Sequence, residues 1–148
     1  KSPHPFIKKH KSRIQLFIPH FEVFKDPQKH VRFCQREKII KAFAILPQTS
    51  FTKIKPIISE LDFVLILTVR PGFYGSKFQK SQIKKIQKIK EHIKTNQLST
   101  KIIIDGSMNP GHLKWCKKAG ADIFISGSYL MKADNSKKAM KELQLAAK

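Results

Sequence analysis

Five short apolar runs, rich in β-branched residues, recur along the chain, and each is followed by turn residues. They span residues 14–18, 39–46, 63–69, 102–104 and 123–126. The runs lack the polar alternation of a strand that has one side in solvent. Continuous apolar character is typical of strands buried on both faces, as in parallel sheets. The pattern therefore predicts five parallel strands.

Amphipathic segments between these runs predict helices. Residues 78–94 carry lysines on most of a helical surface and an apolar stripe on the rest. The stripe consists of Phe78, Ile83, Ile86, Ile89 and Ile93. A second helix is predicted over 110–118, with Asn109 as N-cap, Pro110 in the first turn and Gly120 at its end.

Strands that alternate with helices predict an α/β fold with a parallel sheet and right-handed crossovers. The chain has 148 residues, which indicates a single domain. Because a complete (β/α)₈ barrel takes about 250 residues, length and strand number alone favour an open, doubly wound sheet.

Composition narrows the class of protein. With 30 Lys+Arg against 10 Asp+Glu, the net charge is +20, yet 41% of residues are apolar, which predicts a folded, very basic domain and not a disordered chain. The longest uninterrupted apolar stretch, 63–67, is far too short to cross a bilayer, so we expect no membrane span.

Two features bear on the compartment. Cys34 and Cys116 lie far apart in the sequence and lack the spacing of a metal or dithiol site, which favours a reducing, cytoplasmic location. A single disulfide between them is the alternative. Residues 1–21 contain Lys, Arg and His but no acid, which leaves an organellar matrix as the alternative and a surface helix as another interpretation. The first residue is Lys1, so we expect a processed chain or an excerpt of a longer one.

In α/β proteins the ligand lies at the carboxyl ends of the strands. Asp105 follows the Ile-Ile-Ile run and is a candidate general acid or base; the alternative is a helix cap or loop anchor. Gly106 and Gly127 end successive strands and Ser128 opens a helical segment, an arrangement suited to a phosphate group. Glycines that merely form turns are the competing interpretation.

His20, two residues before Glu22, is a candidate metal ligand or base, or else a hydrogen-bonded structural group. The remaining histidines show no metal-ligand spacing. The sequence has no GxGxxG, P-loop, HExxH or nucleophile-elbow motif.

Taken in order, these segments resemble the ribulose-phosphate 3-epimerase family. Residues 67–78, LTVRPGFYGSKF, are similar to its MTVxPGFGGQKF signature, and residues 105–110, DGSMNP, to its DGGINP. Residues 119–128, AGADIFISGS, are similar to AGAD…AGS, residues 20–22 to FHxE, and residues 41–49 to KAG…NPxT. The resemblance runs nearly from end to end and implies a partial (β/α)₈ TIM barrel, containing strands four to eight.

The resemblance also implies a function. That family interconverts ribulose 5-phosphate and xylulose 5-phosphate, two pentulose 5-phosphates, by moving the C3 proton between two aspartates through an enediolate that a divalent metal stabilises (Zn, Fe, Mn or Co). Asp105 would serve as one metal ligand and as one of the two acid/base groups. The implied substrate- and phosphate-binding residues are Gly72, Phe73, Tyr74, Gly75, Gly106, Ser107, Gly127 and Ser128.

Several departures from the family pattern weaken the implied activity. The other metal ligands would lie upstream of Lys1, so we expect this chain alone to be inactive. Arg70, Tyr74, Ser76 and Ser107 replace the family's usual residues. Tyr74 adds bulk beside the sugar phosphate, and Ser107 restricts the backbone of the phosphate loop.

Two further expectations concern partners. The alternative function is a non-catalytic, epimerase-derived module that binds RNA or a ribonucleoprotein such as a ribosome through its lysines. An AT-rich genome would also explain the lysine excess. An incomplete barrel leaves unpaired edges and should expose inward-facing side chains such as Leu65, Leu67 and Ile103 to a second copy or to a missing amino-terminal half.

Overall fold

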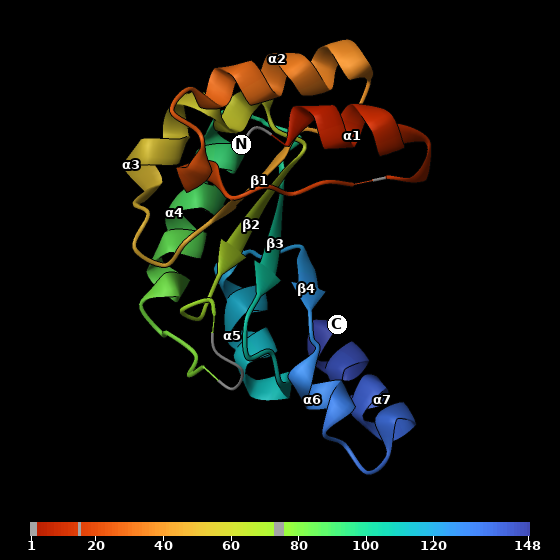
Figure 1. Cartoon of the computed structure of the whole chain (residues 1–148). Coiled ribbons are helices and arrows are strands. Elements are labelled where there is room, and N and C mark those ends of the chain that lie inside the picture. Colours follow the sequence, from red (N-terminus) through yellow and green to blue (C-terminus); the bar gives the residue numbers. More distant parts are fainter. Residues whose placement is uncertain (1–2, 15, 73–75) are drawn as a thin grey trace.

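The computed structural model describes residues 3–14, 16–72 and 76–148 of the chain. Its sheet contains β1 (Ala42–Ile45), β2 (Phe63–Leu67), β3 (Lys101–Asp105) and β4 (Ile123–Ile125) (Figure 1). All neighbouring strands are parallel, and their order in the sheet is β1-β2-β3-β4. An α/β fold with parallel strands is therefore confirmed.

Helices connect the strands and extend both ends of the sheet. The α-helices are α1 (His4–His10), α2 (Pro27–Glu37), α3 (Phe51–Ile54), α4 (Gln82–Thr95), α5 (Pro110–Ala119), α6 (Ser128–Met131) and α7 (Ser136–Ala147). Three 3₁₀ turns accompany them: η1 (Lys11–Arg13), η2 (Phe21–Val23) and η3 (Lys55–Glu60). Within the described ranges, no helix is long and apolar enough to cross a membrane.

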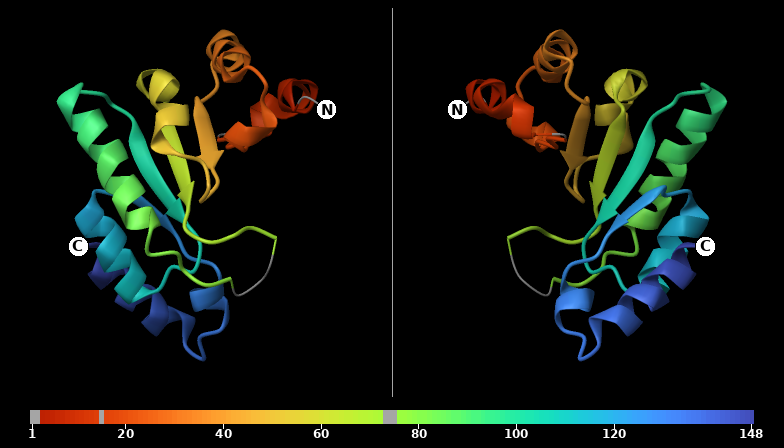
Figure 2. Two further views of the ribbon diagram at one scale, coloured as in Figure 1. Left: turned by 90° about the vertical axis from the view of Figure 1, so that its left-hand side faces the viewer. Right: turned by 90° about the vertical axis from the view of Figure 1, so that its right-hand side faces the viewer.

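The strand order decides between an open sheet and a barrel. A doubly wound sheet reverses its strand order and carries helices on both faces, whereas barrel strands follow one another and keep their helices outside. Here the strands follow one another, and residues from α2, α3, α4 and α5 pack against the same sheet face in one core cluster. Figure 2 shows α4, α5 and α7 on one side of the sheet. The fold is therefore a partial TIM barrel, and the expectation of an open doubly wound sheet from length alone is wrong.

The two predicted long helices form, with revised bounds. In α5, the side chain of Asn109 accepts a hydrogen bond from the backbone N–H of His112, and Gly120 ends the helix with φ +105°, as the caps predict. The helix predicted from residue 78 begins at Gln82 instead. Residues before it serve the loop, since the Gln79 N–H donates to the Thr68 carbonyl at 2.8 Å.

The strand predicted over 14–18 is not seen in the described residues. One parallel bridge, between His20 and Ala44, occupies its place, with the Ala44 N–H donating to the Pro19 carbonyl at 2.8 Å. Pro19 has no N–H with which to continue a ladder. Instead of five strands, the described residues therefore form four strands plus a single bridge at the β1 edge.

Candidate active site

The carboxyl ends of β2, β3 and β4 form one rim. In the strand register, Asp105 pairs with Leu67 on one side and with Ile125 on the other. Register partners of parallel strands point to the same face. Asp105 therefore lies on the sheet face that also carries Leu65 and Ile103, and Gly127 follows Ile125 by two residues.

Asp105 is half-buried at this rim. Burial raises the pKa of its carboxyl group, and the backbone N–H of Gly106 opposes this by donating a hydrogen bond that lowers it. A carboxyl with a raised pKa holds and releases a proton closer to neutral pH, which suits general acid/base work.

The turn after Asp105 is fixed by Thr68, a buried residue that sequence reasoning did not single out. The Thr68 N–H donates to the Asp105 carbonyl at 2.8 Å, and the Thr68 hydroxyl donates to the Gly106 carbonyl at 2.6 Å. Gly106 has φ +120°, and a Cβ at this position would lie 2.8 Å from a Val69 methyl carbon. Close approach and backbone conformation therefore both require glycine here.

Ser107 joins three segments of the rim. Its φ is +52°, the left-handed region that glycine adopts more readily. Its hydroxyl donates to the Ser76 carbonyl at 2.7 Å, and the His112 Nδ1–H donates to the Ser107 carbonyl at 2.7 Å. The His112 ring in turn stacks on Phe78 at 4.2 Å between ring centroids.

A cavity of about 580 Å³ opens beside this loop. Ser107 and His112 line it from the end of β3 and from α5, Ser128 from α6, and Lys132 and Lys138 from the following segment and α7. The structure therefore brings Ser107 and Ser128 together. It adds two cationic side chains, a histidine and the carboxylates of Asp134 and Glu142, none of which the sequence motifs indicated.

The remaining predicted glycines are open. A Cβ added to Gly127 or to Gly72 would meet no atom within 4 Å, and Gly72 has φ +98°. Phe73, Tyr74 and Gly75, also predicted for this site, lie outside the described residues.

The histidine at the β1 edge lies in a different setting from Asp105. His20 Nδ1 is 3.8 Å from a Glu22 carboxylate oxygen. Glu22 itself accepts hydrogen bonds from the Leu46 N–H at 2.9 Å and from the Thr49 hydroxyl. Glu22 therefore stabilises the loop after β1 by these two hydrogen bonds.

Lys85, on α4, binds the same loop. Its ammonium donates to the carbonyl groups of Leu46 and Pro47 at 3.1 and 2.8 Å, and burial lowers its pKa to about 8. The sequence pattern placed Lys85 on the charged, solvent-facing side of the helix.

The metal donors at the rim are few. In the ranges that the structure describes, no group of three or more His, Cys, Asp or Glu side chains could hold a metal ion. One carboxylate, that of Asp105, does not make a complete ligand set for a divalent cation.

The fold and rim define a partial (β/α) barrel, and comparison identifies the family. The ribulose-phosphate 3-epimerase family model matches residues 3–131, so the chain belongs to this family. Its relatives include the ribulose-phosphate 3-epimerases of Methanocaldococcus jannaschii, 38% identical over 90% of this chain and 62% of the relative, and of Helicobacter pylori strain 26695, 32% identical over 88% and 60%. The chain thus spans about three fifths of the length of these relatives.

A solved structure shows the same fold. A chain of the Amycolatopsis orientalis BexX/CysO complex matches with a TM-score of 0.62 over 95% of this chain and 57% of that one, at 13% identity. At this identity the match supports the architecture alone.

Proposed function

We propose that this chain forms the phosphate-binding side of a ribulose-phosphate 3-epimerase, whose complete form interconverts ribulose 5-phosphate and xylulose 5-phosphate. The observation that carries the proposal is the position of Asp105, half-buried beside the Gly106–Ser107 turn and on the same rim as Gly127 and Ser128. Family membership and the identity to the M. jannaschii enzyme support it.

The phosphate of the substrate would bind at the Ser107 and Ser128 side of the cavity. Ser128 offers a hydroxyl donor, whereas the Ser107 hydroxyl already donates to the Ser76 carbonyl. Lys132 and Lys138 bring positive charge to the cavity, and the carboxylates of Asp134 and Glu142, which also line it, oppose part of that charge. Gly127 leaves its backbone accessible, because nothing lies within 4 Å of an added Cβ.

Asp105 would handle one of the two protons of an epimerisation at C3. Its carboxylate takes the C3 proton as the C–H bond breaks and the enediolate forms, and a group on the opposite face then donates a proton to C3. Of the four strands, β3 is the one that ends in a carboxylate, because β1, β2 and β4 end in Ile45, Leu67 and Ile125. We therefore propose that the chain alone does not turn over substrate.

Asp105 would also supply one carboxylate to a divalent metal. The described residues do not complete a ligand set around it. The proposed proton transfer is therefore assigned to Asp105 without a step through the metal.

Phosphate binding and turnover are tested separately. We expect ³¹P NMR of xylulose 5-phosphate to shift on addition of the chain, and Ser128→Glu to weaken this binding at least about tenfold, since a carboxylate repels the phosphate. Ser136→Glu, which places the same charge at the start of α7 outside the cavity lining, serves as the matched control and should bind as the parent chain does. Equal effects of the two variants would contradict the phosphate site.

Turnover is measured in a coupled assay with added Zn²⁺, Fe²⁺, Mn²⁺ or Co²⁺. We expect no xylulose 5-phosphate to form from ribulose 5-phosphate with the purified chain. Metal-dependent turnover that Asp105→Asn abolishes would show instead that the chain carries a complete site.

A further inference from the structure

A second cavity lies between α1, η2 and α2, at the opposite end of the molecule from α6 and α7 (Figure 1). Its volume is about 880 Å³. Four cationic side chains line it, together with one carboxylate, that of Asp26: the cations are Lys25, Lys29, Arg32 and Arg36. Two of the four arginines in the chain are therefore gathered here.

The cations form a row. Lys29, Arg32 and Arg36 are three and four residues apart on α2, so they share one helical face. At a rise of 1.5 Å per residue the row extends about 10 Å along the helix. A row of this length matches successive phosphates of an extended backbone better than it matches one phosphoryl group.

Both arginines keep their charge available to a ligand. Arg32 and Arg36 have 63% and 73% of their side-chain surface exposed, and their ion pairs with Asp26 and Glu37 are long, at 3.6 and 3.5 Å. The Arg32–Asp26 pair is exposed on both sides, and pairs of this kind are weak. Glu37 is more buried but also accepts a hydrogen bond from Lys11 at 3.2 Å, so Arg36 is not its sole partner.

A buried aromatic ring lies beneath one of the cations, because Phe33 is 6% exposed. The Arg36 guanidinium lies 5.7 Å from the centre of the Phe33 ring, and the His4 ring stacks on Phe33 at 4.1 Å. The positive charge of Arg36 contributes to lowering the pKa of His4, after burial. The ring supports the Arg36 guanidinium from below, while the exposed guanidinium groups stay open to a ligand. Exposed guanidinium planes along a cationic track are among the components with which proteins bind single-stranded nucleic acids.

We propose that the cavity lined by Lys25, Lys29, Arg32 and Arg36 binds the phosphate backbone of a single-stranded nucleic acid. The assignment is independent of the proposed epimerase site, because it uses other residues at the other end of the molecule. A ligand anion here replaces the long ion pairs of Arg32 and Arg36 with direct phosphate contacts.

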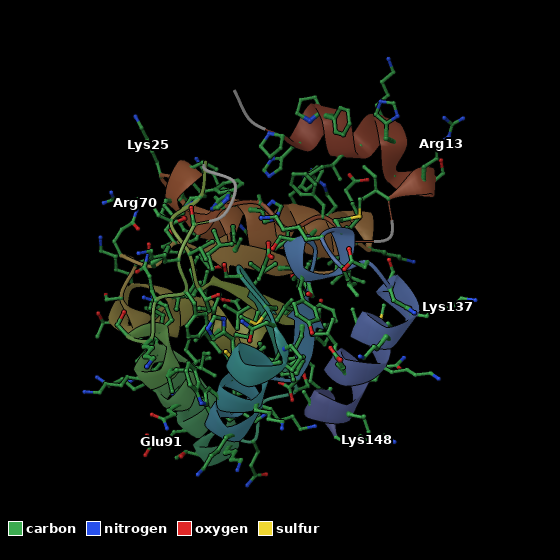
Figure 3. The ribbon with its side chains drawn as sticks, turned by 90° about the horizontal axis from the view of Figure 1, so that it is seen from below. Arg13, Lys25, Arg70, Glu91, Lys137 and Lys148 are labelled. Atoms are coloured by element: carbon green, nitrogen blue, oxygen red, sulfur yellow. The ribbon has the colours of Figure 1, made fainter. Side chains whose placement is uncertain are left out.

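The test is fluorescence anisotropy of a labelled oligouridylate of about eight nucleotides, a length within the usual site size for such binding. The variant is Arg32→Gln/Arg36→Gln. The matched control is Lys137→Gln/Lys141→Gln, which removes the same charge from exposed positions of α7. Figure 3 shows Lys137 across the molecule from Lys25.

The arginine variant should bind at least about tenfold more weakly, whereas the lysine control should change affinity less than about threefold. The slope of log K against log salt should fall by about 1.4 in the arginine variant, since each phosphate contact of a single strand contributes about 0.7. An equal loss of affinity in both variants would show that binding depends on the net charge of the chain and not on this cavity, and would overturn the assignment.

Two further arms identify the ligand. Inorganic phosphate should not displace the oligonucleotide at the concentration of the added salt; full displacement would show a site for one phosphoryl group and contradict the proposal. Sedimentation with vesicles of anionic lipid should show no loss specific to the arginine variant, and such a loss without oligonucleotide binding would assign the cavity to a membrane surface instead. Circular dichroism confirms that both variants fold.

Discussion

The two faces of the sheet are built from the same kinds of residue but are covered to different extents. On the outer face, Phe43, Ile45, Val64, Ile66, Ile102 and Ile104 are fully buried beneath the helices. On the inner face, which a closed barrel would enclose, Leu65, Leu67 and Ile103 are 3–8% exposed, but Ile123 and Ile125 on β4 are 41% and 42% exposed. The outer face supplies stability, and the inner face carries Asp105 and the rim.

This comparison changes which apolar side chains the incomplete barrel leaves exposed. Leu65, Leu67 and Ile103 were expected to face an open groove, yet they are buried against one another and against Ala44, with Ile18, Leu46 and Phe63 around them. The exposure falls at the β4 edge instead, on Ile123 and Ile125. Association through this edge, with a second copy or with an amino-terminal half of the barrel, stays a prediction.

The largest expected effect separates the two faces directly. Ile102→Ala removes a fully buried side chain from the outer face and should lower the free energy of unfolding by about 2–5 kcal/mol. Ile123→Ala, the same change on the partly exposed neighbouring strand, should lower it by about 1 kcal/mol or less. Urea unfolding measures both, and similar losses would show that the inner face at β4 is as well packed as the outer face.

The next prediction concerns a titratable group at the outer face. His30 is fully buried, its ring centroid lies 5.0 Å from that of Phe43, and it contacts His4 and Cys34. Burial, followed by the charge of His4, lowers the pKa of His30 from 6.5 to about 4. Between these values the unfolded chain binds a proton that the folded chain excludes, so stability should fall as pH falls from about 6.5 to about 4.

The expected loss is roughly 3 kcal/mol at the acid end, from 1.36 kcal/mol for each of the about 2.5 pKa units between 6.5 and about 4. His30→Gln should flatten most of this dependence, leaving the smaller part due to His4, whose pKa is also lowered. His92→Gln, in a partly exposed position near the end of α4, should leave the dependence unchanged. Urea unfolding at a series of pH values checks this, and an unchanged slope in His30→Gln would locate the acid sensitivity elsewhere.

The rim of the inner face offers a matched pair of glycines. Gly106→Ala forces a Cβ to within 2.8 Å of Val69 at φ +120° and should cost more than about 1 kcal/mol of stability. Gly127→Ala, at φ −99° with open space around it, should stay within about 0.5 kcal/mol of the parent chain. Thermal unfolding distinguishes them. Equal stability of the two variants would mean that the side chains of Thr68 and Val69 shift to admit the new Cβ at no cost in stability.

The sequence predicted much of this fold because its main signals are local. Continuous apolar runs identified four of the strands, and Asn109 and Gly120 marked both ends of α5 correctly. The prediction of an edge strand at 14–18 failed because apolar character does not show whether a run has a ladder partner, and Pro19, directly after this run, has no N–H to donate to one. The motif predicted Asp105 and its glycines as site residues. The roles of Thr68 and Lys85 depend on contacts between residues 37 to 39 positions apart, and that of His112 depends on a ring turned toward a loop, which no local pattern records.

The smallest expected effect lies at Ser107, where two opposing terms nearly cancel. Its left-handed backbone costs about 1–2 kcal/mol, and its hydroxyl bond to the Ser76 carbonyl, 2.7 Å long, returns about 1 kcal/mol. Ser107→Gly relieves the backbone strain but loses the bond and gives the unfolded chain more freedom, so its stability should change by less than about 0.5 kcal/mol. Ser107→Ala keeps the strain and loses the bond, and should be less stable by about 1 kcal/mol. Urea unfolding of the two variants therefore separates the strain from the hydrogen bond. An alanine variant as stable as the parent chain would show that the hydroxyl contributes nothing. A glycine variant more stable by over about 1 kcal/mol would show that backbone strain at Ser107 outweighs its hydrogen bond to the Ser76 carbonyl.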